Sequence, residues 1–153
     1  MKIFFLMLFA SMSLFAVTPN ALLGNWYAYR ESLLNGTQTI EKEYLHINGN
    51  RTFTIQLFVS VQKGDAFIKD LRIEGSGIWK SRDNTLVLYI KKVEVPFAKE
   101  IYLISQESLR NLANNFKYKY ESVPLRILDI KSLSATQLVT SSEKLLETVY
   151  TRQ

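Results

Sequence analysis

Apolar and polar residues alternate with a period of two along much of this chain, and this alternation constrains its fold more than any other feature. Between residues 52 and 62 the odd positions are apolar, and the even positions are polar apart from Phe58. Successive side chains of a β-strand point to opposite faces, so the pattern predicts a strand that is buried on one face. Turn-forming pairs flank it, Asn48-Gly49 before and Gly64-Asp65 after.

The same pattern recurs along the chain and predicts an all-β protein. We expect strands at residues 25–34, 39–48, 52–62, 66–79, 85–95, 99–104, 125–133, 136–141 and 145–152. Eight or nine consecutive strands on short turns favour an up-and-down antiparallel barrel, because closure of the sheet removes its free edges. In residues 105–120 apolar residues recur instead at helical spacing, which predicts one α-helix between late strands. That helix would either pack on the barrel or act as a lid over its mouth.

The first sixteen residues differ from the rest and predict export. Met1-Lys2 is a short positive start, and an unbroken apolar run follows from Ile3 to Ala10. This arrangement is typical of a secretory signal peptide, cleaved here after Ala16, and the run is short for a membrane span. We therefore expect a mature chain of residues 17–153 that forms a single domain in the periplasm or outside the cell. The chain has no cysteine, which excludes disulfides, thiolate catalysis and cysteine-based metal or haem sites.

Two Gly-x-Trp motifs and a late arginine resemble the lipocalins. Gly24 and Trp26 belong to a Leu-x-Gly-x-Trp opening of the first predicted strand, and Gly77 and Trp79 lie in the fourth. Residues 83–88, 127–130, 133–139 and 150–152 are similar to stretches of small bacterial lipocalin-like proteins. The resemblance implies a cup-shaped barrel in which the cationic Arg152 packs across the ring of Trp26. The helix falls before the seventh predicted strand rather than after the eighth, which favours the broader calycin superfamily.

A barrel of this kind implies an exported protein that holds one small hydrophobic or amphipathic ligand. The net charge is +5, and removal of Lys2 with the signal peptide leaves +4, which favours an anionic head group such as that of a fatty acid. The candidate lining residues are Phe53, Ile55, Leu57, Val59, Phe67, Leu71, Leu88, Tyr89 and Tyr102. The alternative role of each of them is plain core packing.

Two other functions stay open at this point. The chain could be an interaction protein with a filled core whose outer surface binds an envelope or host component, as the outward-facing Phe58 indicates. An enzyme would have to use His46, the single histidine, which the alternation places toward solvent. Glu41 and Glu43 share a strand face and could form a carboxylate pair, although a solvated face is expected. No catalytic residue, metal site, cofactor or nucleic-acid partner is predicted, and the oligomeric state is left open.

Overall fold

The computed structural model describes residues 16–96 and 98–153 and confirms the all-β barrel with one α-helix. Its elements in chain order are a 3-10 turn η1 (Pro19–Leu22), β1 (Gly24–Leu34), β2 (Thr37–Ile47), β3 (Thr52–Lys63), β4 (Ala66–Arg82), β5 (Thr85–Glu94), β6 (Glu100–Tyr102), α1 (Gln106–Ser122), β7 (Leu125–Leu133), β8 (Gln137–Ser142) and β9 (Glu147–Arg152). The predicted signal peptide lies, apart from Ala16, outside the described residues.

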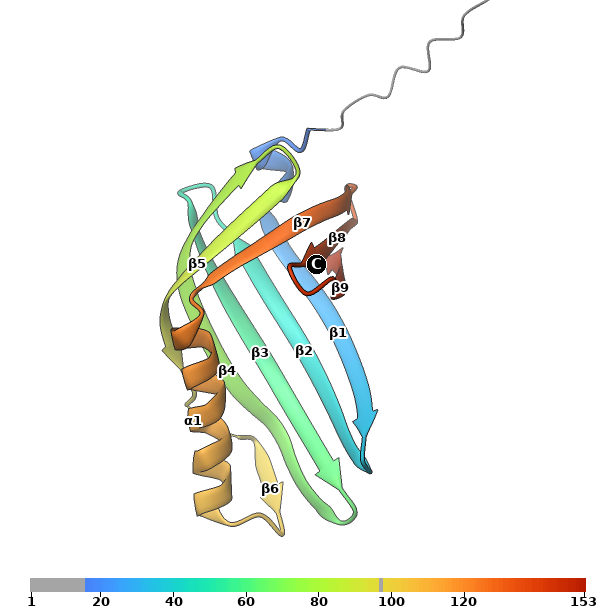
Figure 1. Ribbon diagram of the computed structural model, residues 1–153, viewed down its shortest axis with the longest axis vertical. Helices are drawn as coiled ribbons and strands as arrows, with labels where there is room; N and C mark the ends of the chain where they lie inside the picture. The colour runs from blue at the N-terminus through green and yellow to red at the C-terminus, as the bar shows by residue number, and fades with distance from the viewer. Residues whose placement is uncertain (1–15, 97) are drawn as a thin grey trace, which may run out of the picture.

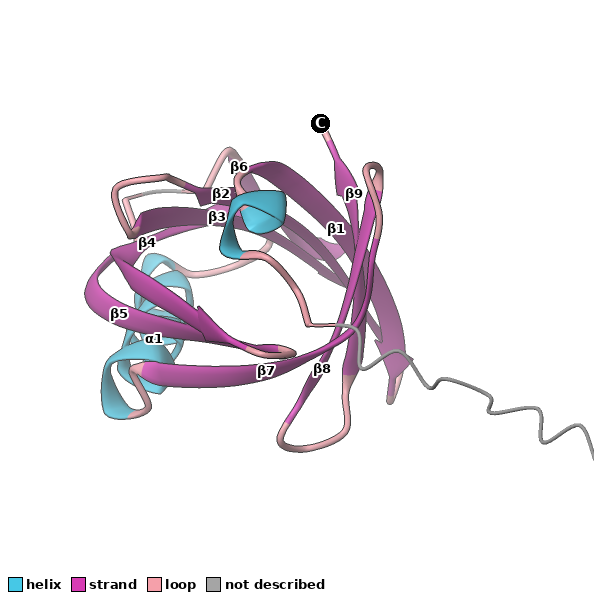
Figure 2. Cartoon of the chain, turned by 90° about the horizontal axis from the view of Figure 1, so that it is seen from above, coloured by secondary structure: helices cyan, strands magenta, loops and turns pink. Residues whose placement is uncertain are grey.

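Eight of the nine strands close into an antiparallel barrel, which Figure 2 shows from above. They follow the order β3-β2-β1-β9-β8-β7-β5-β4 around the barrel, and β4 pairs again with β3. β6 is the extra strand, because it pairs only with residues 67–69 of β4. The alternation predicted the other strands to within a few residues. The sixth strand, expected at residues 99–104, is only three residues long and lies outside the closed ring.

Strands of unequal length divide the barrel into two halves (Figure 1). β1 to β4 have 11, 11, 12 and 17 residues, whereas β8 and β9 have 6 residues each. In Figure 1 the four long strands continue downward past the ends of β7, β8 and β9. We call the upper part, where all eight strands pair, the closed half. The lower part, walled by β1 to β4, β6 and α1, is the open half.

The helix α1 forms part of the wall of the open half (Figure 1). Ser105 caps its first turn, because the Ser105 hydroxyl accepts a hydrogen bond from the Ser108 N–H at 3.0 Å. Leu109, Leu112 and Phe116 recur at helical spacing and pack against the buried core. The helix contacts β5 and β4. The predicted helix is therefore confirmed, and it packs on the barrel wall.

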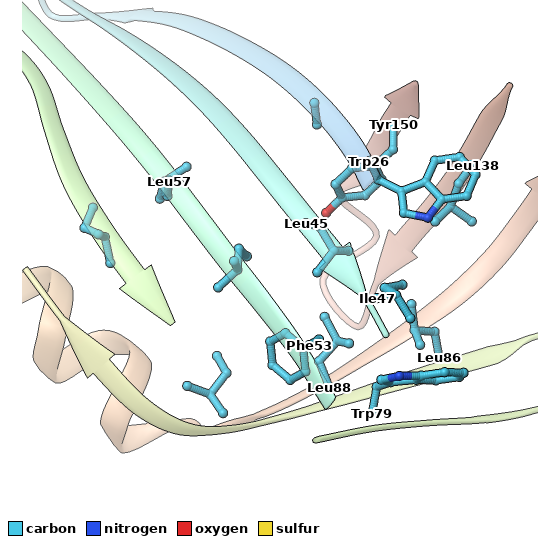
Figure 3. Packing of buried hydrophobic residues seen from close by; sticks show 14 of the residues in the cluster. Trp26, Leu45, Ile47, Phe53, Leu57, Trp79, Leu86, Leu88, Leu138 and Tyr150 are labelled. Carbon is cyan, nitrogen blue, oxygen red and sulfur yellow. The ribbon is translucent and has the colours of Figure 1, made fainter. Parts of the chain in front are cut away.

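Most of the large core side chains lie in the closed half (Figure 3). Trp26 and Leu86 are 0% exposed, and Phe53 is 1% exposed. The apolar positions of β3 that the alternation identified all lie on the inner face of the barrel. Complete burial of one such side chain contributes about 1.5–3 kcal/mol to the free energy of unfolding. The core therefore stabilises mainly the half in which the barrel is closed.

A glycine allows β4 to pass close to β5. The pairing register between the two strands shifts between Ser76 and Gly77, which marks a β-bulge. A Cβ atom at Gly77 would lie 1.8 Å from the carbonyl oxygen of Tyr89, so no other residue fits here without moving the backbone. Trp79 follows two residues later and is buried. The second Gly-x-Trp motif thus has a structural role in the wall of the barrel.

Candidate functional site

The first Gly-x-Trp motif and the late arginine meet at the end of the closed half. The guanidinium carbon of Arg152 lies 4.1 Å from the centroid of the Trp26 ring, which is the contact that the resemblance implied. Arg152 also donates hydrogen bonds to the carbonyl oxygens of Leu23 at 2.6 Å, Ala21 at 2.9 Å and Ala135 at 2.7 Å. One side chain therefore joins the N-terminal turn, the β7–β8 turn and the core.

Trp79 lies in a comparable arrangement. The guanidinium carbon of Arg51 is 4.8 Å from the centroid of the Trp79 ring, and the indole N–H donates to the carbonyl oxygen of Asn48 at 2.8 Å. Gly24, which precedes Trp26, has a φ of +122°, a conformation that favours glycine. The motif residues Gly24, Trp26, Gly77, Trp79 and Arg152 thus hold the closed half together.

The predicted lining residues fall into two groups. Those on the inner face of the barrel and buried are Phe53, Ile55, Leu57, Val59, Leu71 and Leu88. Tyr89 and Tyr102 are 42% and 53% exposed, and Tyr89 faces outward because it follows the inward Leu88. Phe67 stacks on Tyr102 with 5.7 Å between ring centroids and lines an open hollow of about 390 Å³ beside β6. Ligand contact by any of these residues stays a prediction.

A buried carboxylate that the sequence did not lead us to expect lies inside the barrel. Glu43 on β2 is 2% exposed. Its carboxylate accepts hydrogen bonds from Arg30 Nη2 at 2.8 Å and from the Tyr150 hydroxyl at 2.6 Å. The expectation of a solvated face is therefore wrong for Glu43, because donors from β1 and β9 replace the water that a carboxylate would otherwise need. Glu41 accepts from Arg30 Nε at 2.9 Å.

A second guanidinium faces the same interior. Arg126 on β7 pairs in register with the buried Leu88 of β5, and cross-strand partners share a face, so the Arg126 side chain points inward. Its guanidinium carbon lies 4.4 Å from the centroid of the Tyr120 ring at the end of α1. Within residues 16–96 and 98–153, no carboxylate oxygen lies within 4.0 Å of this guanidinium. We call Arg30, Glu43, Tyr120, Arg126 and Tyr150 the interior polar cluster.

Burial and neighbouring charges together determine the protonation states of the cluster. Burial raises the pKa of the Tyr150 phenol well above its usual value, and the Glu43 carboxylate raises it further. Burial also raises the pKa of Tyr120, and the charge of Arg126 opposes that rise only in part. Burial lowers the pKa of Arg30, but the two glutamates outweigh this effect and the net pKa is raised. At neutral pH both phenols are therefore neutral hydroxyls and the Arg30 guanidinium is charged.

The chemistry of the cluster is suited to binding an anion. Both glutamates form their ion pairs with Arg30, whereas Arg126 donates a hydrogen bond to Tyr120 and interacts with the Glu43 charge only at longer range. Its remaining donors can turn to an oxygen anion from outside the protein. Planar guanidinium groups recognise carboxylates and phosphates through paired hydrogen bonds. His46 lies on the outer face, where its ring nitrogen Nδ1 bonds to the Asn25 side chain, so it does not join the cluster.

Sequence reasoning missed Arg126 and Tyr120, and it misjudged Glu43. The alternation did place Glu43 in phase with the inward Leu45 and Ile47, and that phase was the available signal. In the described part of the chain no helix is long and apolar enough to cross a membrane. Scans against models of protein families and against curated proteins found no match to this chain.

Proposed function

We propose that the chain is an exported, lipocalin-like binding protein that holds a small amphipathic anion with its head group at Arg126. The observation that carries the proposal is the inward Arg126 guanidinium, which stacks on Tyr120 and has no carboxylate oxygen within 4.0 Å in the described residues. The charge of Glu43 acts on it only from a longer distance. A guanidinium removed from water is stabilised by a charged partner. A bound carboxylate or phosphate would supply that partner.

The apolar part of the ligand would lie toward the open half. Leu57 pairs in register with Glu43, and Val59 and Val61 follow it along the inner face of β3 in that direction. On the opposite wall, Leu112 and Phe116 of α1 pack against the same core. A ligand with its head group at Arg126 would extend its alkyl chain toward these apolar side chains, which is the arrangement that an alkyl carboxylate requires.

Paired ligands test this role of Arg126. We expect dodecanoate to bind more tightly than dodecanol, because the two share an alkyl chain and differ in the charged head group. The substitution Arg126→Gln should weaken dodecanoate binding by about 10- to 100-fold, because a hydrogen bond to a charged group contributes about 1.5–3 kcal/mol. It should leave dodecanol binding nearly unchanged. Isothermal titration calorimetry measures both affinities.

A matched control separates the cluster from general surface charge. Arg110 is exposed on α1, and Arg110→Gln removes the same charge outside the barrel. We expect wild-type affinity for both ligands from this variant. If the protein binds neither ligand, or if Arg126→Gln does not change the preference for dodecanoate, the proposal is wrong.

Export with cleavage after Ala16 is part of the proposal. Ala16 is exposed, whereas Val17 is 8% exposed and its N–H donates to the carbonyl oxygen of Asp83 at 3.3 Å. Val17, the first residue of the predicted mature chain, is thus packed into the fold while the neighbouring Ala16 is exposed, and this supports the cleavage position. Mass measurement of the protein recovered from the periplasm or medium of its own host should give a chain of residues 17–153. A chain that keeps residues 1–16 would contradict it.

A further inference from the structure

One strand of the open half has a free edge. β9 pairs with β1 only at Trp26 and Tyr27, and from there to Leu34 the described residues pair with β1 on the β2 side alone. In Figure 1 the lower part of β1 is the right-hand border of the sheet. Tyr29 and Leu33 on this segment are 49% and 76% exposed. A long exposed edge with apolar side chains is a template for pairing with another strand.

The turn between β1 and β2 determines which backbone groups face that edge. Asn35 and Gly36 have φ angles of 51° and 74° and form a two-residue turn of type I′. The residues that flank such a turn, Leu34 and Thr37, bond to each other, so the N–H and C=O groups of Tyr29, Glu31 and Leu33 point away from β2. The Asn25 carbonyl, in phase with these three, accepts from the Gln153 N–H on the same side at 3.0 Å.

The negative charge of Glu31 determines which kind of strand is favoured as a partner of this edge. Glu31 lies between Tyr29 and Leu33 on the outer face, and its carboxylate accepts hydrogen bonds from the Tyr29 hydroxyl and the Gln38 amide. In the described part of the chain it has no cationic partner. A second copy that paired antiparallel through all three residues would place Glu31 opposite Glu31, and like charges directly opposite each other destabilise a sheet. A basic residue at that place would instead be favoured.

We propose that residues 29–34 of β1 bind an extended peptide segment by strand addition, with a lysine or arginine opposite Glu31 and apolar residues opposite Tyr29 and Leu33. The main-chain groups of Tyr29, Glu31 and Leu33 supply the hydrogen bonds, and the three outer-face side chains supply the preference for an apolar-basic-apolar pattern. This inference is independent of the ligand proposed for the barrel interior.

The peptide acetyl-Thr-Leu-Thr-Lys-Thr-Leu-Thr-amide is the probe, and amide hydrogen exchange followed by NMR is the measurement. In the free protein the amides of Tyr29, Glu31 and Leu33 should exchange quickly, and those of Arg30 and Ser32 slowly, because the latter bond to β2. Saturating peptide should slow the first three and leave the other two unchanged. Binding through side chains alone would not give this alternation.

A charge exchange tests the preference for a basic residue. The control peptide has glutamate in place of lysine, and Glu31→Lys is an exposed substitution that should not disturb folding. We expect wild type to prefer the lysine peptide by about fivefold and Glu31→Lys to prefer the glutamate peptide by a similar factor. Three outcomes would overturn the proposal: slow exchange of the three amides in the free monomer, protection that rises with protein concentration alone, or peptide binding without their protection. The second would show that another copy of the chain occupies the edge.

Discussion

At the scale of single residues, Arg152 connects several parts of the closed half through its guanidinium group. It stacks on Trp26 and donates to three carbonyl oxygens. We expect Arg152→Ala to lower the free energy of unfolding by about 2 kcal/mol, since the ring contact and the charged hydrogen bonds are lost together. The melting temperature should fall by about 5 °C, and tryptophan emission should shift to the red as water reaches Trp26. Thermal unfolding followed by fluorescence measures both effects.

Two further variants serve as comparisons for this prediction. Arg82→Ala removes an arginine whose side chain is 91% exposed and whose ion pair with Asp83 spans 4.0 Å, so we expect an unchanged melting temperature. Arg152→Lys keeps the charge but cannot donate to three carbonyls from one planar group, so it should resemble Arg152→Ala. Equal melting temperatures for wild type and Arg152→Ala would show that the Trp26 contact does not stabilise the barrel.

At the residue scale, contacts between distant side chains were hard to predict from the sequence. Trp26 and Arg152 were paired through the motif resemblance, which relies on residue types at separated positions. Glu43 was in phase with the core, but its burial depends on the Tyr150 hydroxyl, 107 positions away along the chain. The inward direction of Arg126 depends on its pairing with Leu88 of β5, which is also distant in the sequence. Partners that meet only after the sheet closes leave no local pattern, so the interior polar cluster could not be predicted.

At the scale of elements, local patterns predicted nearly everything. Alternation and turn pairs identify a strand because they depend only on neighbouring residues. The predicted turn at Gly64-Asp65, which joins β3 to β4, is one such case. What they do not identify is which strands pair. The strand β6, which ends at Tyr102, pairs with residues 67–69 of β4. This stretch of β4 is available because β5 pairs with β4 only from Glu74 onward. At 17 residues, β4 is the longest strand. Strand length, and therefore the open half, follows from tertiary pairing.

At the scale of the whole molecule, the interior polar cluster connects segments from all parts of the chain. Glu43 and Arg30 come from β2 and β1, Tyr150 from β9, Arg126 from β7 and Tyr120 from α1. Unfolding exposes all of these groups to water at once. The pH dependence of global stability therefore reports on the cluster, and the two buried phenols determine its sign at alkaline pH.

Below about pH 10 both phenols hold their protons in the folded and in the unfolded chain, so their contribution to stability is fully present. Above that pH the unfolded chain releases these protons while the folded chain, in which burial raises the pKa of Tyr150 and Tyr120, retains them. Stability should therefore fall as pH rises above 10, by up to about 1.4 kcal/mol per pH unit for each phenol. Urea unfolding at pH 8, 10 and 11 measures this fall.

Tyr150→Phe distinguishes two effects of the buried Tyr150 phenol: its hydrogen bond to Glu43 and its retained proton at alkaline pH. At pH 8 the variant should be less stable by about 1–3 kcal/mol, because the Glu43 carboxylate loses a buried donor. Above pH 10 its stability should fall less steeply than that of wild type, because one of the two protons that the folded state retains is gone. Tyr118→Phe, which removes a phenol that is 73% exposed, should be as stable as wild type at pH 8 and lose stability as steeply. If Tyr150→Phe and wild type lose stability with the same slope, the Tyr150 phenol does not stay protonated inside the folded barrel.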